Sequence, residues 1–404
     1  SGTAMIKIVI IGGGASGLMA AIQAARKGAQ VTLLEQNEKI GKKILATGNG
    51  RCNLTNLHQE PSCYHCSQPD YPWRVIEQFP LTETLSFFYQ LGISTRDRNG
   101  WLYPYSDQAS SVAQVLEMEA RYQKVRIKTR EEITDIQCLG EGFTVVTKTW
   151  KYDCDRVVIC CGSKASSVEG SAESGYHLAQ KLGHRLIEPM PALASLKGKG
   201  NYFSKWAGAR MEGILQLEID GKAGKKERGE ILFTEYGISG IAVFQLSGTA
   251  VRAARTGHTV TCCLDLMPDF TEEELLAFLK ERQSACPYKS LKELMIGFLP
   301  QKLISVLVTP KSDLDTIVHN IKCWRIPIRD AWSLRQAQIC SGGVDTTQIT
   351  SQLESTLHPG LFFAGEIVDV DGPCGGYNLQ WAWSSGAVAG RTAAKAGSTE
   401  RRIL

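Results

Sequence analysis

The sequence predicts an α/β fold in which both ends of the chain build one parallel sheet and a mostly β domain is inserted between them. Two observations predict this arrangement. Within the first 35 residues an apolar strand, a glycine-rich turn, a helix and a second strand follow one another, and residues 359–394 again read as strand, turn and helix. Between them the composition changes to short alternating strands.

Length and composition set the limits of the interpretation. The 404 residues suffice for two or three domains of about 150 residues each. A hydrophobic content of 43% allows sizeable cores, and a formal net charge of +4 is too small to argue for a nucleic-acid partner by itself. No apolar run approaches the ~18 residues that a membrane helix requires, and no secretory signal pattern is visible. We therefore expect a cytoplasmic protein without a membrane partner.

The first expected strand, residues 6–11 (IKIVII), is followed directly by GGGASG. Gly12, Gly14 and Gly17 satisfy the pattern GxGxxG, and residues 15–27 have the composition of a helix. In a dinucleotide-binding unit the first glycine makes a tight turn, the second lets the backbone approach a pyrophosphate, and the third lets helix and strand pack closely. The helix N-terminus then offers amide donors and a positive dipole to the phosphates.

The second expected strand, QVTLLE, ends at Glu35, 18 positions after Gly17. A carboxylate at this position accepts hydrogen bonds from a ribose diol and repels a 2′-phosphate, so NADP is disfavoured at this site. Strand, glycines, helix, strand and acid in this register predict dinucleotide binding, with Ala15 and Ser16 in the first turn of the helix. Both FAD and NAD fit this unit.

Later segments decide between the two cofactors. Residues 152–163 predict another strand of the same sheet, ending at Gly162, and residues 361–364 predict a strand that ends at Gly365 and Glu366. A carboxylate there can accept a hydrogen bond from a ribityl hydroxyl, and the following helix can face the electron-rich N1/O2 edge of a flavin. NAD has no ribityl chain, so this second binding position, at Gly365 and Glu366, predicts FAD. The alternative is an ordinary final strand–helix unit that binds no cofactor.

The middle of the chain predicts a separate domain. Alternating strands surround the turn at Asp220 and Gly221, and residues 271–299 have helical periodicity that begins with a capping box at Thr271. Near Gly342 the chain returns toward the sheet. The expected domains are an FAD-binding domain from residues 1–187 and 343–404, and an inserted β domain from residues 188–342 that carries a helical subdomain at about 271–335.

The chain resembles the BaiN/RdsA-like (YhiN-like) NAD(P)/FAD-dependent flavoproteins of bacteria. The resemblance rests on IVIIGGGASGLMAA, GKKILATGNGRCNLTN, GEILFTEYGISG, SGGV and FFAGEIVDVDGPCGGYNLQWAWSSG. It implies a two-dinucleotide-binding-type FAD domain and a flavin-dependent oxidoreductase. Members of this family are associated with reducing carbon–carbon double bonds in bile-acid-type steroid enones and in uridine of ribosomal RNA, and an amine-oxidase-type activity is attached to relatives.

The resemblance also implies site residues. The loop after Glu35 is expected to fold over the cofactor through Lys43, Asn49, Gly50, Arg51 and Asn53, since lysine or arginine can neutralise a pyrophosphate and Gly and Asn tolerate positive φ. The other implied cofactor-binding positions are Gln36, Cys52, Ile133, Gly376, Tyr377, Asn378 and Leu379. Cys52 is interpreted as a thiol proton donor, a charge-transfer partner or a small side chain packed beneath the cofactor. Tyr377 is the second candidate proton donor.

Three functions stay open at this point. The first is reduction of a small enone with NAD(P)H, which would bind transiently because the sequence contains no second GxGxxG. The second is flavin-dependent reduction of uridine to dihydrouridine in ribosomal RNA, and the third is an amine-oxidase-type enzyme or a non-catalytic flavin sensor. The oligomeric state stays open as well.

The thirteen cysteines are expected to be reduced thiols. CYHC, with Cys63, His65 and Cys66, is the one segment that suggests a metal or redox site. It lacks a second ligand pair, so no metal is expected.

Overall fold

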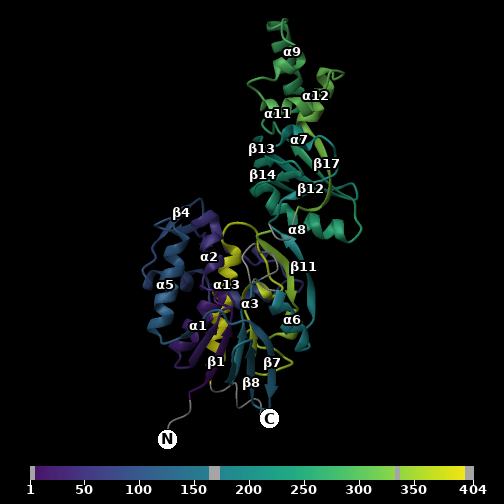
Figure 1. Ribbon diagram of the computed structural model, residues 1–404. Coiled ribbons are helices and arrows are strands. Elements are labelled where there is room, and N and C mark those ends of the chain that lie inside the picture. Colours follow the sequence, from purple (N-terminus) through teal and green to yellow (C-terminus); the bar gives the residue numbers. More distant parts are fainter. Residues whose placement is uncertain (1–4, 163–172, 333–336, 396–404) are drawn as a thin grey trace. The chain divides into compact units, whose positions relative to one another are not determined.

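Both ends of the chain contribute to one unit of the protein. The computed structural model describes residues 5–162, 173–332 and 337–395. These residues divide into two compact units, one within Ser1–Pro189 and Ile339–Leu404 and the other within Met190–Gln338. Figure 1 shows the purple N-terminal and yellow C-terminal segments side by side in the first unit.

A five-stranded parallel sheet of order β19-β10-β1-β2-β6 lies at the centre of the first unit. Its strands are Lys7–Ile11 (β1), Gln30–Leu34 (β2), Arg126–Lys128 (β6), Arg156–Ile159 (β10) and Leu361–Phe363 (β19). Every residue of β10 and β19 is buried, which is typical of a parallel sheet covered on both faces. The predicted Rossmann-like α/β class is confirmed.

Two helices from opposite ends of the chain, α1 (Ala15–Arg26) and α13 (Tyr377–Ala393), pack directly on each other. A Cβ atom on Gly386 would lie 2.5 Å from the carbonyl oxygen of Ser16. One on Gly390 would lie 2.3 Å from the carbonyl oxygen of Ala20. Because no side chain fits in this space, the glycines of α13 let the two backbones approach closely enough to share one site.

The remaining elements of the first unit surround the central sheet. Two antiparallel three-stranded sheets have the orders β7-β8-β9 and β3-β5-β4, and β11 pairs with β18. The strands are Thr55–Asn56 (β3), Thr95–Arg98 (β4), Trp101–Pro104 (β5), Ile133–Leu139 (β7), Gly142–Thr147 (β8), Lys151–Cys154 (β9), Leu186–Ala192 (β11) and Ile339–Val344 (β18). The helices are Lys42–Ala46 (α2), Tyr71–Ile76 (α3), Leu81–Gln90 (α4), Ala109–Tyr122 (α5) and Glu173–Lys181 (α6).

The single strand expected over residues 152–163 is wrong, because this segment forms the two strands β9 and β10 in different sheets. The change of sheet occurs at Asp155. Its amide donates to the carbonyl oxygen of Lys7 (2.8 Å), and its carboxylate accepts from the amide of Lys7 (2.8 Å). These bonds attach the chain to the start of β1, so β10 enters the parallel sheet in register.

The second unit is a closed barrel of order β12-β15-β14-β13-β16-β17 with associated helices. Its strands are Leu196–Gly198 (β12), Arg210–Ile219 (β13), Lys222–Phe233 (β14), Gly237–Ser239 (β15), Val260–Asp265 (β16) and Trp324–Ala331 (β17). Its helices are Phe203–Trp206 (α7), Ile241–Arg255 (α8), Glu272–Ala285 (α9), Leu291–Leu294 (α10), Gln301–Leu307 (α11) and Leu314–Lys322 (α12). No helix in the described ranges has the length and apolarity needed to cross a membrane.

The helical periodicity of residues 271–299 does not correspond to one helix. Thr271 caps α9 as expected, because its hydroxyl accepts from the amide of Glu274 (3.1 Å). The helix ends at Ala285, and Pro287 follows shortly after, where its ring cannot continue a helix. A capping box between Ser290 and Glu293 then begins α10 as a separate turn.

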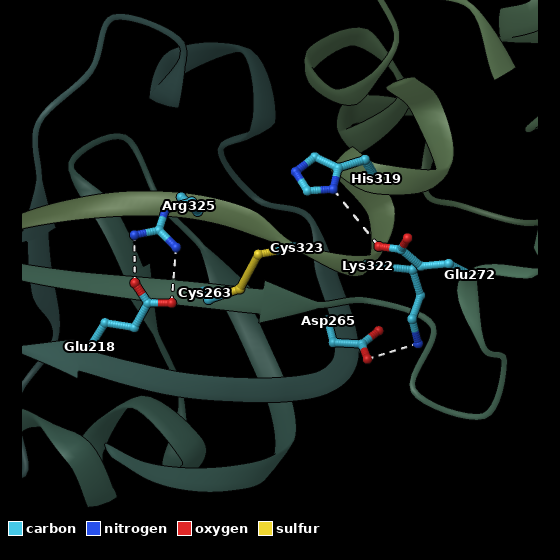
Figure 2. Close-up of a disulfide and its surroundings, with 8 residues drawn as sticks. All are labelled: Glu218, Cys263, Asp265, Glu272, His319, Lys322, Cys323 and Arg325. Atoms are coloured by element: carbon cyan, nitrogen blue, oxygen red, sulfur yellow. Dashed lines mark hydrogen bonds and ion pairs between the residues drawn. A yellow bond between two sulfur atoms is a disulfide. The ribbon is translucent and has the colours of Figure 1, made fainter. Parts of the chain in front are cut away.

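A disulfide joins Cys263 in β16 to Cys323, the residue that follows α12. The expectation that all cysteines are reduced thiols is therefore wrong for this pair. Figure 2 shows ion pairs on either side of it, between Arg325 and Glu218 and between Lys322 and Asp265 (2.8 Å). The bond ties the helical segment to the barrel across a sequence separation of 60 residues.

We expect reduction of Cys263–Cys323 to lower the free energy of unfolding by up to about 4 kcal/mol. Closing a loop of this length removes chain entropy from the unfolded state. Denaturant unfolding with and without reductant measures the effect, and a Cys286→Ser variant, which changes a cysteine outside the disulfide, serves as the control. An identical free-thiol count before and after reduction would contradict the assignment.

His184 makes stability depend on pH. The ring is 3% exposed, its Nε2 lies 2.7 Å from the hydroxyl of Ser355, and burial together with His358 lowers its pKa to about 4. The unfolded chain binds a proton at about pH 6.5. Between about pH 6.5 and 4 the unfolded state therefore binds more protons, and up to roughly 3 kcal/mol of stability is lost as pH falls. Unfolding curves from pH 7 to 4 should show this slope, and a His184→Gln variant should flatten it.

Candidate functional site

The glycine-rich turn forms an open cradle at the N-terminus of α1. Gly12 has φ +104°, and a Cβ atom there would lie 2.7 Å from the carbonyl oxygen of Cys160. A Cβ atom on Gly17 would lie 1.7 Å from the carbonyl oxygen of Gly12, so this glycine permits the close packing of helix on turn. At Gly14, by contrast, a Cβ atom would meet nothing within 4 Å. The backbone at Gly14 thus faces open space that a ligand can fill.

The start of α1 supplies hydrogen-bond donors to that space. Gly14 is the N-cap and has no side chain to satisfy the first amides of the helix, which include those of Ala15 and Ser16. Free amides and a positive helix dipole are the features that bind a pyrophosphate. This cradle fits the phosphates of the FAD that the sequence predicts.

Glu35 lies next to the cradle, directly after β2. Its Oε1 accepts from the amide of Gly13 (2.9 Å), and its Oε2 accepts from the amide of Asn37 (2.7 Å). Each carboxylate oxygen has a further lone pair that can accept from a ribose hydroxyl. Gln36 is exposed beside it, and Ile133 begins β7 two residues after Glu131, whose amide donates to the carbonyl oxygen of Glu35 (2.9 Å). These residues border the position expected for the adenosine.

The predicted second binding position, at Gly365 and Glu366, lies against the start of α1. Gly365 has φ +80°, its amide donates to the hydroxyl of Ser385 (2.9 Å), and a Cβ atom on it would lie 2.4 Å from Oγ of Ser16. Lys43 Nζ lies 2.6 Å from Glu366 Oε2, and a Cβ atom on Gly162 would lie 3.6 Å from the same Nζ. Three segments that are remote in the sequence therefore meet at one edge of the sheet.

The loop over residues 47–53 is exposed from Gly48 to Arg51 and buried at Cys52 and Asn53. Asn49, Gly50 and Arg51 are exposed, and Asn49 and Gly50 have positive φ, as their residue types allow. Cys52 is fully buried (0% exposed), and this burial raises the pKa of its thiol to about 12. A thiol in this state is neutral at physiological pH and is enclosed by the protein.

Asn53 connects this loop to the start of α13. In the amide orientation that satisfies its neighbours, its side chain donates to the carbonyl oxygens of Thr55 (2.9 Å) and Leu102 (3.0 Å). Its oxygen accepts from the amide of Gly376 (3.1 Å). Asn53 is 6% exposed, so its side chain positions backbone segments rather than reaching outward.

The N-cap of helix α13 is Gly376, which has φ +91° and no capping side chain, so the first amides of the helix remain available. The side chain of Asn378 bonds both backbone groups of Gly372 (2.8 and 2.9 Å), and Leu379 is half-buried. The side chain of Asn378 is therefore already engaged within the turn, and its backbone amide is the group that it has left for a ligand.

Tyr377 is the first residue of α13, and its ring is 6% exposed. Its ring lies edge-on to Tyr64, with centroids 5.8 Å apart, and its hydroxyl bonds the thiol of Cys63. Burial and the neighbouring thiol raise the pKa of Tyr377 above its ordinary value, so the phenol stays protonated. Neither segment carries a sequence signal for the pairing of Cys63 with Tyr377, since only the fold brings the two together.

The two cysteines of CYHC contact different residues. Cys63 bonds Tyr377, whereas the Cys66 sulfur lies 3.5 Å from the hydroxyl of Thr346. Among the residues that the structure describes, no cluster of three or more His, Cys, Asp or Glu side chains is placed to bind a metal ion.

Known proteins are similar to this chain in sequence and in fold. A family model described as "HI0933-like protein Rossmann domain" matches residues 6–392. The 3-dehydro-bile acid delta(4,6)-reductase of Clostridium scindens is 42% identical over 97% of this chain and 100% of its own. The ribosomal RNA dihydrouridine synthase of Escherichia coli is 30% identical over 93% of this chain and 95% of its own. A structure of 3-ketosteroid delta1-dehydrogenase from Sterolibacterium denitrificans has a TM-score of 0.51 at 12% identity, covers 97% of this chain and 100% of that one, and shares the fold alone.

Proposed function

The chain belongs to the HI0933-like protein family, and from that premise we propose that it is an FAD-dependent reductase of a carbon–carbon double bond in a small enone. That it is a flavin-dependent oxidoreductase follows from its relatives. The finer proposal is carried by one observation, the 42% identity over whole chains to the 3-dehydro-bile acid delta(4,6)-reductase. We further propose that NAD(P)H is the electron donor and binds transiently.

We propose that residues of both chain ends hold FAD together. The cradle at Gly14 and the first amides of α1 would hold the pyrophosphate, Glu35 the ribose, and Glu366 the ribityl chain, with Lys43 balancing the charge of Glu366. The first amides of α13 would meet the N1/O2 edge of the flavin. Bound FAD would supply the hydride chemistry.

Reduction of an enone also needs a proton for the carbon next to the carbonyl, and we propose Tyr377 as its source. The raised pKa keeps the Tyr377 hydroxyl protonated, and the tyrosine stands at the start of α13, where the flavin edge is expected. The thiol of Cys52 is also protonated, but it is enclosed within the protein. Cys52 is therefore better explained as packing beneath the cofactor.

Anaerobic stopped-flow spectroscopy tests the proposed function. The oxidised flavin band should bleach with NADH or NADPH and should return when a 3-oxo-4-ene steroid is added. The steroid should be recovered with two more hydrogens. Bleaching that no enone reverses would contradict the substrate class, and no bleaching with either nucleotide would contradict the donor.

Reduction of uridine in ribosomal RNA is the second candidate. It is supported by two relatives named ribosomal RNA dihydrouridine synthase, at 30% and 29% identity over 93% of this chain. The same stopped-flow experiment distinguishes it, because reoxidation by an rRNA fragment and not by the steroid would favour this candidate.

A further inference from the structure

One face of the small β3-β5-β4 sheet in the first unit carries both arginine and aromatic side chains. Antiparallel pairing sets Arg96 opposite Tyr103 and Arg98 opposite Trp101. Residues opposite each other, and residues two apart in one strand, point to the same side of a sheet. These four side chains therefore share one face, which we call the arginine–aromatic face, and all four residues are half-buried. Asp97, between the two arginines, points to the other side.

The arginine–aromatic face contacts both segments that are expected to hold the flavin ring. A Cβ atom on Gly48, in the loop over residues 47–53, would lie 3.5 Å from Cε1 of Tyr103. A Cβ atom on Gly375, in the turn before α13, would lie 3.2 Å from Cε2 of Trp101. The carbonyl oxygen of Gly375 also accepts from the side chain of Asn56 in β3 (3.0 Å). The face therefore adjoins the proposed flavin site within one unit of the protein.

The two guanidinium groups of this face are only partly satisfied by the protein. That of Arg96 lies 4.2 Å from the ring centroid of Tyr105 and donates to the carbonyl oxygen of Tyr105 (3.3 Å). Arg98 pairs with the carboxylate of Asp107 (2.5 Å). Nε of Arg96 and Nη1 of Arg98 are buried and have no hydrogen-bond partner among the residues that the structure describes. Each arginine thus keeps a donor that an acceptor from outside the chain can use.

Positive charge exceeds negative charge at this face. The hydrogen bond from Arg98, together with the nearby charges of Arg96 and Arg51, lowers the pKa of the Asp107 carboxyl. Three guanidinium groups therefore lie near one carboxylate. Arg51 is exposed and Tyr105 is 63% exposed, so a ligand can reach both. Arginines beside accessible aromatic rings are suited to nucleotides, because they contact phosphates while the rings stack on bases.

We propose that the arginine–aromatic face binds the dinucleotide electron donor, NADH or NADPH, with its phosphates on Arg96 and Arg98 and its adenine against the ring of Tyr105. This assignment rests on the proposed function and gives the donor of that reaction a site. An RNA strand requires a groove of cations that follows its backbone over several nucleotides. Here Arg96 and Arg98 are gathered in one hairpin, which suits the compact pyrophosphate of a dinucleotide better.

Hydride donors with and without phosphates test this site in the whole flavoprotein. Dihydronicotinamide riboside carries the reactive ring of NADH but has neither phosphates nor adenine. Arg96→Met and Arg98→Met should each raise the Kd for NADH and NADPH, obtained from the concentration dependence of flavin bleaching, by about 10- to 100-fold. This is the effect expected for the loss of one charge-assisted contact, and bleaching by the riboside should not change. Arg74→Met, which removes an exposed arginine of α3 outside this face, is the control and should change neither.

Binding without electron transfer gives a second readout. Titration calorimetry of the oxidised flavoprotein with NAD+ and NADP+ should show the same weakening in Arg96→Met. Arg96→Lys, which keeps the charge, should recover part of the affinity. Because Arg96 forms no ion pair in the described part of the chain, its replacement leaves no carboxylate unpaired, and flavin content should stay at the wild-type level.

Equal Kd values for the nucleotides in wild type and Arg96→Met would overturn the site while the reductase stands. Slower reoxidation by the steroid in Arg96→Met, with unchanged nucleotide affinity, would show that the face binds the acceptor and would also overturn it. Loss of rRNA binding in both arginine variants, again with unchanged nucleotide affinity, would have the same meaning. If nucleotide binding depends on Arg96 but no enone reoxidises the flavin, the site stands and the proposed substrate class fails.

Discussion

A Gly14→Val variant is expected to fold as the wild type does and to lose FAD. Gly14 has φ −89° and ψ −160°, an extended conformation that valine adopts readily, and a Cβ atom there meets no protein atom within 4 Å. The added side chain would instead occupy the space expected for the pyrophosphate. We expect FAD affinity to fall at least ~100-fold, which equals about 2.7 kcal/mol. Flavin absorbance of the purified protein and its reconstitution with FAD measure this loss.

Gly17→Val provides the contrasting variant. Its Cβ atom would overlap the carbonyl oxygen of Gly12 at 1.7 Å, so this substitution should destabilise the unit itself. Thermal unfolding followed by far-UV circular dichroism distinguishes the two outcomes. A Gly14→Val protein that retains full flavin content would show that the cofactor lies elsewhere.

A Tyr377→Phe variant should keep its flavin and lose about 100- to 1,000-fold in kcat for the enone. The substitution removes the proton donor and preserves the ring that packs against Tyr64. Bleaching of the flavin by the donor should proceed at the wild-type rate, since that half-reaction does not need this proton. Only reoxidation by the enone should slow, which stopped-flow spectroscopy resolves.

Tyr64→Phe is the matched control, because it removes a neighbouring hydroxyl that donates to Gln59 (2.6 Å) and should change kcat less than about threefold. The pH profile gives an independent test. Since the pKa of Tyr377 is raised, the phenol stays protonated above the ordinary tyrosine value of about 10, and reoxidation should not decline up to that pH. Equal reoxidation rates in wild type and Tyr377→Phe would exclude Tyr377 as the donor.

The features predicted well are those whose physical cause is local in the chain. The GxGxxG turn, α1 and the acid at Glu35 all lie within the first 35 residues. One short stretch of sequence therefore contains both the elements and the glycines that connect them. The hydrogen bonds of Thr271 and Ser290 are equally local. The closing strand β19 was recognised from an apolar run followed by glycine.

The features that sequence reasoning missed depend on distant contacts. Apolar residues on both sides of Asp155 read as one strand, and only pairing with Lys7 divides them. The contact of Cys63 with Tyr377 has no signal in either segment alone.

The packing of α13 on α1 has a consequence for biosynthesis. The cradle at Gly14 and the predicted ribityl-binding position at Glu366 are complete only when β19 and α13 are in place, and these elements are translated after the inserted barrel. While the inserted barrel leaves the ribosome, the N-terminal half of the sheet lacks its neighbour β19, and the surface of α1 that receives Gly386 and Gly390 is uncovered. We therefore expect FAD to be loaded at the proposed site only after α13 has been translated. Until then strand β10 lacks its partner β19, and we expect this apolar edge of the sheet to be exposed to chaperones.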